Sequence, residues 1–151
     1  MKFDLVAYDK FDQLVLVGEI KAKLTASIGW ASQLRRNILA HGLTPSAKFF
    51  LVALPDRLYL WKNAGNLPDL VEPDYIVDAQ PLLDSYFARA GLTAQTISGQ
   101  TFELLVVLML NDLFLKDVAS LQKQGDFKWL LESGLYDELQ GGRIEQEKLA
   151  T

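Results

Sequence analysis

The chain has 151 residues, half of them hydrophobic and 23% charged, and its net charge is −4. This length and composition suit one globular domain with a packed core and exclude a mostly disordered chain. The sequence holds no Cys and a single His, His41, which excludes disulfide scaffolds, Cys-ligated zinc, thiol catalysis and mechanisms that need two histidines.

Two further exclusions concern membranes and export. The longest unbroken apolar run, Leu104 to Leu110, is too short to cross a bilayer, so we expect no membrane association. The first residues include the charged Lys2 and Asp4, and they lack the apolar stretch of a signal peptide. We therefore expect a cytoplasmic protein.

Charge is distributed unevenly along the chain. The overall negative charge argues against nucleic-acid binding. However, the first 62 residues hold nine Lys or Arg and five Asp or Glu, a net charge of +4, whereas the remainder carries −8. Two interpretations follow: a basic face on the first part of the chain, or ordinary surface charge that keeps the protein soluble.

The chain begins with a pattern that predicts two paired strands. Residues 2–8 and 14–23 are rich in β-branched, aromatic and other apolar residues, and the short polar segment 9–13 between them is turn-like. A connection this short predicts an antiparallel hairpin. The run from Leu14 to Val17 is apolar on both faces, so we expect the second strand to be central in its sheet.

A helix is expected next. Thr25 or Ser27 can cap its start, and it should extend to about Ala40, where Gly42 stops it. Its apolar residues recur at helical spacing and should face the core. They are Ile28, Ala31, Leu34 and Ile38, and Arg35 and Arg36 fall off this face.

The remaining elements complete the predicted fold. They are expected as strands at 49–54 and 58–61 with the tight connection 55–57 between them, a loop at 62–74, a short strand at 75–77, a helix at 81–90, a long helix from Ser98 or Thr101 to about Leu115, and a helix at 127–132. The long helix is apolar nearly all round, so it should be buried in the core or against another subunit. The order predicts an α/β or α+β domain with a mixed sheet flanked by helices.

Three charged residues are predicted to meet at one end of the hairpin. Glu19 and Lys21 point to the same face because side chains alternate along a strand, and a suitable register brings Asp4 beside Glu19. Two carboxylates on a rigid hairpin offer the hard oxygen ligands that Mg²⁺ or Mn²⁺ prefers. A metal there would polarise a phosphodiester, and an ammonium could orient the attacking water. The alternative is an ordinary ion pair at a strand end.

This arrangement resembles the PD-(D/E)xK, or restriction-endonuclease-like, nuclease superfamily. The segments FDLVAYDKFDQLVLVGEIKAK and KFFLVALPDRLYLWK carry the resemblance, which covers about the first 62 residues. The whole chain also looks like a family of small uncharacterised bacterial proteins assigned to that superfamily. The resemblance implies a core of a central mixed sheet flanked by helices, to which this chain adds C-terminal helices.

The resemblance also implies roles for individual residues. Asp4 matches the Asp of the motif, Glu19 the second acid and Lys21 the lysine. The backbone carbonyl of Ile20 would be a further metal ligand, and Gln33 falls near a functional Gln of some members.

The chain departs from the family pattern at three points. Only three residues precede Asp4, where the family core has a helix, Phe3 stands in place of the usual Pro, and Asn37 stands where a Tyr often follows the Gln.

Other residues have two interpretations each. Lys23, Arg35 and Arg36 could form a phosphate-binding edge or be solvated helix charges, although adjacent arginines cannot face the same way on a helix. Trp30 could stack on a base or belong to the core. His41 could be a general base or a helix cap.

Two functions therefore follow from the sequence. One is a nuclease that hydrolyses DNA with Mg²⁺ or Mn²⁺ held by Asp4 and Glu19, with Lys21 assisting the water. A homodimer is expected in that case, since one small domain spans little of a duplex. The other is an inactive protein of the same fold that serves as an interaction or assembly module. The first requires the three residues to be within reach of one metal on a basic, open face, and the second predicts a closed or salt-bridged cluster.

Overall fold

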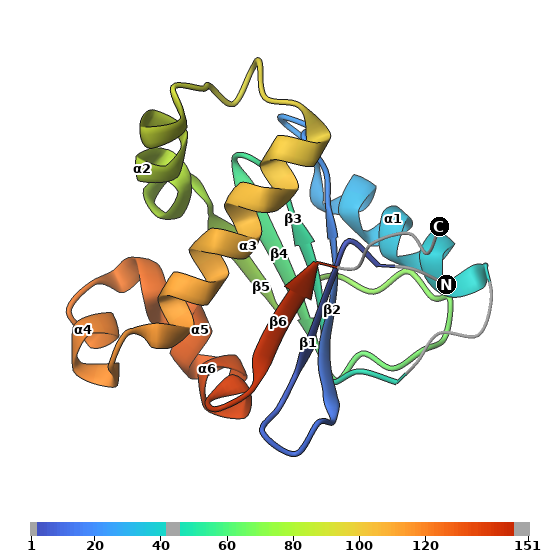
Figure 1. The fold of residues 1–151 in the computed structure, drawn as a ribbon. Helices are drawn as coiled ribbons and strands as arrows, with labels where there is room; N and C mark the ends of the chain where they lie inside the picture. The colour runs from blue at the N-terminus through green and yellow to red at the C-terminus, as the bar shows by residue number, and fades with distance from the viewer. Residues whose placement is uncertain (1–2, 42–45, 147–151) are drawn as a thin grey trace, which may run out of the picture.

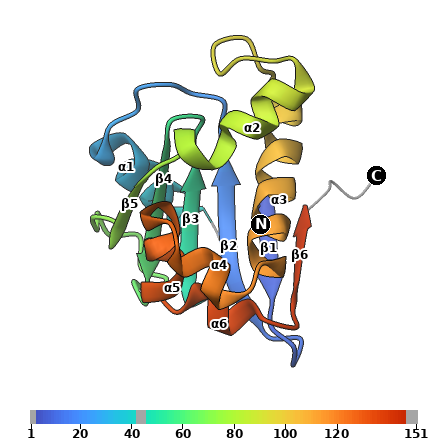
Figure 2. The same ribbon diagram turned by 90° about the vertical axis from the view of Figure 1, so that its left-hand side faces the viewer.

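Six strands form one mixed sheet with helices on both faces (Figures 1 and 2). The strands are β1 (Leu5–Tyr8), β2 (Leu14–Ile20), β3 (Phe49–Ala53), β4 (Arg57–Lys62), β5 (Tyr75–Asp78) and β6 (Arg143–Gln146). Their order in the sheet is β5-β4-β3-β2-β1-β6, with β2 and β3 parallel and every other neighbouring pair antiparallel. This computed structural model describes residues 3–41 and 46–146. The predicted mixed sheet flanked by helices is confirmed.

The helices are divided between the two faces of the sheet. They are α1 (Ile28–Ala40), α2 (Gln80–Ala90), α3 (Gly99–Leu115), α4 (Val118–Gln122), α5 (Lys128–Glu132) and α6 (Leu135–Leu139), with a 3₁₀ turn at Gly125–Phe127. Figure 1 shows α1 on one face and α2 and α3 on the other. Within the described residues, no helix is both long and apolar enough to cross a membrane.

The sheet separates two apolar clusters. The larger one lies under α2, α3, α5 and α6 and includes Leu5, Leu16, Phe102 and Trp129. The smaller one lies under α1, and we call it the α1-side cluster. It consists of the buried residues Phe3, Val6, Val17, Ala26, Ala31, Phe50, Val52, Leu54, Tyr59 and Trp61. Strands β1 and β2 contribute to both clusters, because successive side chains along a strand point to opposite faces of the sheet.

The predicted hairpin is confirmed. The β1–β2 register pairs Leu5 with Gly18 and Val6 with Val17. In the turn, Asp9 Oδ1 accepts the backbone N–H groups of Phe11 and Gln13, which explains why a polar segment connects the strands. Strand β2 lies between β1 and β3, so the prediction of a central strand is also confirmed.

Helix α1 begins as predicted and buries a wider face than predicted, since Ala31 is buried and Leu34 and Ile38 pack against the α1-side cluster. Ser27 is its N-cap and accepts the Trp30 N–H at 3.0 Å. The buried residues are Ala31, Ser32, Arg35 and Leu39, whereas Ile28 is 36% exposed. The expectation that Arg35 falls off the core-facing side is wrong. The position of Gly42, expected to stop this helix, lies outside the described residues.

The burial of Arg35 has a clear physical reason. Its guanidinium lies 5.8 Å from the ring centroid of Phe50 and 5.9 Å from that of Trp61. It also donates a hydrogen bond to the Gly65 carbonyl at 3.0 Å. Two aromatic faces and a loop carbonyl therefore replace water around a charge that is 1% exposed. The loop that follows β4 supplies the carbonyl, so the helix sequence alone contains no sign of this contact.

The second half of the chain holds the elements that the sequence did not predict, α4, α6 and β6. Strand β6 is short and polar, and it exists because it pairs with β1 along residues 143–146. Such a partner cannot be seen in a local pattern. The long helix α3 begins at Gly99 with Ser98 as its cap. Its core face is buried, but Leu104 and Leu108 are about half exposed, so burial on most sides is not observed.

Candidate active site

The hairpin register brings Asp4 and Glu19 together at the open end of β1 and β2. Leu5 pairs with Gly18, so the residues that precede and follow this pair are neighbours across the strands. The backbone N–H of Asp4 donates to Glu19 Oε2 at 3.3 Å, and Asp4 Oδ2 accepts the backbone N–H of Ile20 at 2.8 Å. These bonds hold both carboxyl groups against the strand ends.

Lys21 completes the cluster as the sequence predicts. Its Nζ lies 3.5 Å from Asp4 Oδ2, and its backbone N–H donates to the Ala53 carbonyl of β3 at 3.0 Å. The Lys21 side chain is 43% exposed and that of Asp4 22%. The ammonium thus sits at the mouth of the cluster, where an incoming ligand can contact it. We call Asp4, Glu19 and Lys21 the acidic site.

Glu19 is the buried member of the acidic site. It is 8% exposed. Burial, together with the neighbouring carboxyl of Asp4, raises the pKa of Glu19 to about 8, and the positive charge of Lys21 opposes this rise. One lysine therefore does not compensate two carboxylates in this partly dehydrated position. A second cation would favour the charged form of Glu19.

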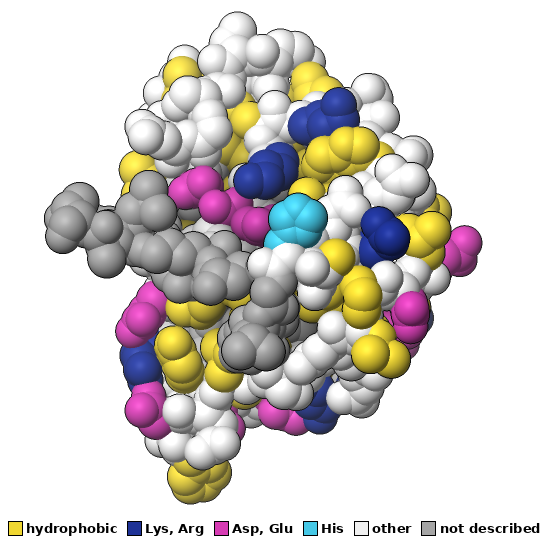
Figure 3. Space-filling model, turned by 90° about the vertical axis from the view of Figure 1, so that its right-hand side faces the viewer, with side chains coloured by type: hydrophobic (Ala, Val, Ile, Leu, Met, Phe, Trp, Pro, Cys, Tyr) yellow, Lys and Arg dark blue, Asp and Glu magenta, His cyan; other side chains and the backbone are white. Residues whose placement is uncertain are grey.

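The acidic site faces the α1 side of the sheet. Val17 belongs to the α1-side cluster, and Glu19, two residues further along β2, points to the same face. Figure 3 views the molecule from this side, and there acidic side chains lie beside basic ones and beside a histidine. This surface has mixed charge, so a uniformly basic face is not observed there.

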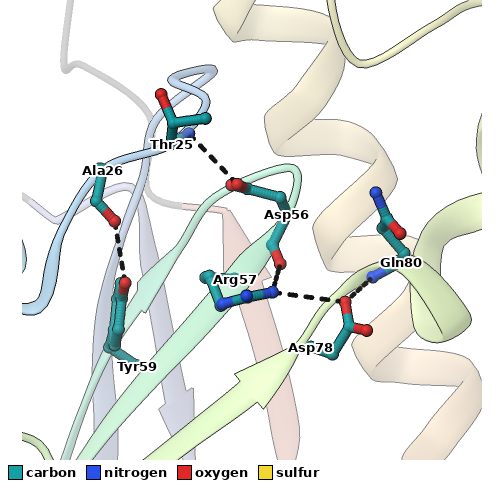
Figure 4. Close-up of polar contacts among 7 residues, drawn as sticks. All are labelled: Thr25, Ala26, Asp56, Arg57, Tyr59, Asp78 and Gln80. Carbon is teal, nitrogen blue, oxygen red and sulfur yellow. Dashed lines mark hydrogen bonds and ion pairs between the residues drawn. The ribbon is translucent and has the colours of Figure 1, made fainter.

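The segment that leaves β2 after Lys21 is fixed to the connection between β3 and β4 (Figure 4). Asp56 Oδ2 accepts the Thr25 N–H at 3.1 Å, and the Tyr59 hydroxyl donates to the Ala26 carbonyl at 2.9 Å. Thr25 has a positive φ of 57° where the chain turns toward α1. Strand β2 ends at Ile20, three residues earlier than predicted. These contacts hold the segment that carries Lys21 and Lys23 in one place.

Arg57 links the connection between β3 and β4 to the neighbouring strand β5. Its guanidinium lies 3.6 Å from Asp78, which also accepts the N–H of Gln80 at the start of α2 (Figure 4). The sequence analysis did not identify Asp56 or Tyr59 as supporting residues. Nothing in a short turn such as Pro55–Arg57 indicates that its carboxylate reaches a loop thirty-one residues away in the chain.

Gln33 lies apart from the acidic site. It lines a groove of about 410 Å³ between α1 and residues 70–72, and none of the three site residues lines that groove. Gln33 is exposed, and it lies beside Gly29 and Ser32, which line the same groove. The structure therefore gives Gln33 no contact with Asp4, Glu19 or Lys21.

The three predicted nucleic-acid contacts differ in their exposure. Arg35 is buried, so it cannot offer its charge to a phosphate at the surface, and that prediction is corrected. Arg36 and Lys23 are exposed. Lys23 Nζ lies 5.5 Å from the ring centroid of Trp30. His41 is the C-cap of α1, and its backbone N–H donates to the Ile38 carbonyl.

The chemistry of the acidic site fits a small divalent cation. Within the described residues, no group of three or more His, Asp or Glu side chains converges to hold a metal. Mg²⁺, however, is usually held by one or two carboxylates and keeps several of its waters. Asp4 and Glu19 supply such a pair, and a bound cation would oppose the rise that burial and the neighbouring Asp4 cause in the pKa of Glu19. The Ile20 carbonyl as a further ligand stays a prediction.

Comparison with known proteins does not indicate a family or a function for this chain. No family model, no curated protein and no solved structure matches this chain.

Proposed function

We propose that this protein is a metal-dependent nuclease of the PD-(D/E)xK type, which hydrolyses DNA phosphodiester bonds at Asp4, Glu19 and Lys21. One observation carries the proposal. Two carboxylates and an ammonium from the two strands of the hairpin are in contact, and the more buried carboxylate has its pKa raised to about 8. An ion pair with Lys21 involves one carboxylate, so the second is available to hold a metal ion.

Each residue of the acidic site has its own role in the proposed reaction. A bound Mg²⁺ or Mn²⁺ would act as a Lewis acid on the phosphodiester and lower the pKa of a water molecule. Glu19 and Asp4 would hold the ion, and Asp4 also orients Lys21 through its 3.5 Å contact. The ammonium of Lys21 donates hydrogen bonds, so it can orient the attacking water or stabilise the charge that grows on the phosphate oxygens.

The proposal is tested by cleavage of supercoiled plasmid and of single-stranded DNA, with Mg²⁺, with Mn²⁺ and with EDTA. Wild-type protein is compared with Glu19→Ala and Lys21→Ala, and Lys128→Ala serves as the matched control because Lys128 is an exposed lysine on α5. We expect metal-dependent cutting that both site variants lose at least 100-fold and the control retains. Equal cutting by every variant would identify a contaminating nuclease and contradict the proposal.

A second function has an observation of its own in its favour. Glu19 is 8% exposed and Lys21 already pairs with Asp4, which is the closed, salt-bridged cluster expected of an inactive protein that serves as an interaction module. Calorimetry with Mn²⁺ separates the two functions. Binding that is lost in Glu19→Gln favours the nuclease, and no binding by the wild type favours the interaction module.

The proposed nuclease acts in the cytoplasm as a homodimer. Support for a dimer comes from α3, where Leu104 and Leu108, four residues apart, are 52% and 53% exposed. Leu115 at the end of the same helix is 85% exposed. Exposed leucines on one helix are a common feature of subunit contacts. Light scattering of wild-type protein and of Leu108→Lys tests this part, because the substitution should leave a monomer.

A further inference from the structure

We infer that Trp30 and Lys23 bind one unpaired nucleotide beside the acidic site, and that the substrate is therefore single-stranded DNA. The inference deepens the proposed function and rests on it for the location of the chemistry. It starts from a difference among the three tryptophans. Trp61 is fully buried and Trp129 is 6% exposed, whereas Trp30 is only partly buried in the first turn of α1. Trp30 thus presents indole surface to solvent.

Trp30 lies on the flank of α1 away from the groove that Gln33 lines, and it is next to Lys23. Trp30, Leu34 and Ile38 are spaced by four residues, so they form one flank of the helix. All three pack against the α1-side cluster, which includes Val6 of β1 and Val17 of β2. The cluster also includes residues of β3 and β4, and Gln33 lines the groove on the opposite flank of the helix.

Lys23 connects the indole to the acidic site. It follows Lys21 by two residues, which places their backbones at most about 7 Å apart, close to the spacing of successive phosphates in an extended strand. Its Nζ lies 5.5 Å from the Trp30 ring centroid. The segment cannot swing away freely, because Thr25 and Ala26 are bonded to Asp56 and Tyr59.

An indole beside the Lys23 ammonium, with Lys21 two residues away along the chain, matches the chemistry of a single strand. Aromatic side chains stack on any base, but only where the base is not already stacked and paired in a duplex. Lys23 can bind a phosphate on the backbone of the same nucleotide, and Lys21 the phosphate that is to be cleaved. A duplex would have to be opened to place a base on Trp30. Single-stranded DNA can make all three contacts without the free-energy cost of opening a duplex.

Intrinsic tryptophan fluorescence provides the first test, since Trp30 is the tryptophan that DNA can reach. Wild-type protein in EDTA is titrated at fixed salt with ten-residue oligothymidine, with an abasic strand of the same length, and with a hairpin duplex. We expect oligothymidine to quench the fluorescence, and the abasic strand and the duplex to bind about tenfold more weakly. Equal affinity for the abasic strand or for the duplex would overturn the inference.

Variants assign the effect to these two residues. In anisotropy titrations with labelled oligothymidine, Trp30→Leu should lose about tenfold in affinity, and Trp30→Phe, which keeps an aromatic ring, should lose less. A plot of log affinity against log salt concentration should have a slope smaller by about one in Lys23→Gln, which corresponds to the loss of one phosphate contact. The control Lys128→Gln should not change this slope. Lys23 is exposed, so its variant tests the inference even if a change at Trp30 disturbs folding. An unchanged salt slope in Lys23→Gln would overturn the role of this lysine.

Failure of the inference can be distinguished from failure of the proposed function. If metal-dependent cutting requires Glu19 and Lys21, but the wild type cuts duplex and single strands equally and Trp30→Leu cuts both as the wild type does, the inference is wrong and the nuclease stands. If oligothymidine quenches the fluorescence of Trp30 but no DNA is cut with any metal, the inferred binding of single strands is supported and the proposed nuclease function is wrong.

Discussion

Asp4 and Glu19 are joined across the hairpin by the bond from the Asp4 backbone N–H to Glu19 Oε2, at 3.3 Å. Sequence pattern can place both residues on neighbouring strands, but only the pairing of Leu5 with Gly18 makes them neighbours. A register shifted by one residue would turn Glu19 toward the opposite face of the sheet. The acidic site therefore depends on the same register that buries the core, and its properties can be tested through the protein's stability as well as through its activity.

The first prediction concerns pH. The pKa of Glu19 is raised to about 8 in the folded protein from its ordinary value of 4.5, so between pH 4.5 and 8 the unfolded chain has lost this proton while the folded protein keeps it. The contribution of Glu19 to stability is thus fully present below pH 4.5 and is lost as the pH rises through 8. Glu19→Gln should remove this loss and be more stable than wild type at pH 8, by on the order of 2 kcal/mol after allowance for solvent.

Urea unfolding in EDTA from pH 5 to 9 measures this difference. Glu132→Gln is the control, because Glu132 is an exposed carboxylate that pairs with Lys128 within α5, and its variant should keep the wild-type pH dependence. A Glu19→Gln variant that lost stability with pH as steeply as wild type would show that Glu19 titrates normally.

The second prediction separates metal binding from catalysis at Lys21. The ammonium lies 3.5 Å from Asp4 Oδ2, so it repels a cation that binds the same carboxylate. Lys21→Gln should raise the affinity for Mn²⁺ about fivefold, because it removes a nearby positive charge that solvent only partly screens. The same variant should lose at least 100-fold in DNA cleavage. Calorimetry and plasmid cleavage measure the two effects, and Mn²⁺ binding weakened by the substitution would contradict the assignment.

The third prediction compares two adjacent arginines. Arg35 is 1% exposed, bonds the Gly65 carbonyl and lies between Phe50 and Trp61, whereas Arg36 is exposed. Arg35→Met should destabilise the protein by about 3 kcal/mol, since it leaves a loop carbonyl without its partner and breaks the aromatic contacts. Arg36→Met should change stability by less than about 0.5 kcal/mol. Denaturant unfolding decides, and equal effects of the two substitutions would refute the buried position of Arg35.

The fourth prediction tests the strand that the sequence did not reveal. A Cβ at Gly142 would lie 2.0 Å from the Tyr8 carbonyl oxygen, because the chain passes close to β1 just before β6. Gly142→Ala should destabilise the protein by about 2–3 kcal/mol, since the backbone itself must move. Gly125→Ala is the matched control, as its Cβ would meet nothing within 4 Å. If both variants melt at the wild-type temperature, β6 is not paired with β1 as described.

The sequence alone was sufficient where the signal is local. The capping Ser27, the apolar run from Leu14 to Val17 and the polar turn at Asp9 predicted α1, a central strand and a hairpin, and each is confirmed. These features depend on neighbours within a few residues, where propensity and hydrogen bonding to the adjacent backbone decide the conformation. The grouping of Asp4 with Glu19 and Lys21 was also predictable, because strand alternation and a short turn leave few registers.

Tertiary structure alone decided the rest. The partners of Arg35 come from β3, β4 and the loop after β4, and β6 forms only because β1 offers it a free edge. The pKa of Glu19 likewise depends on how far the folded sheet excludes water from its carboxyl group. Burial, long-range strand pairing and the electric field inside a site all depend on residues that are distant in the chain. The amino-acid pattern thus determined which groups meet at the hairpin end, and the packing of the whole sheet determined their charge and exposure.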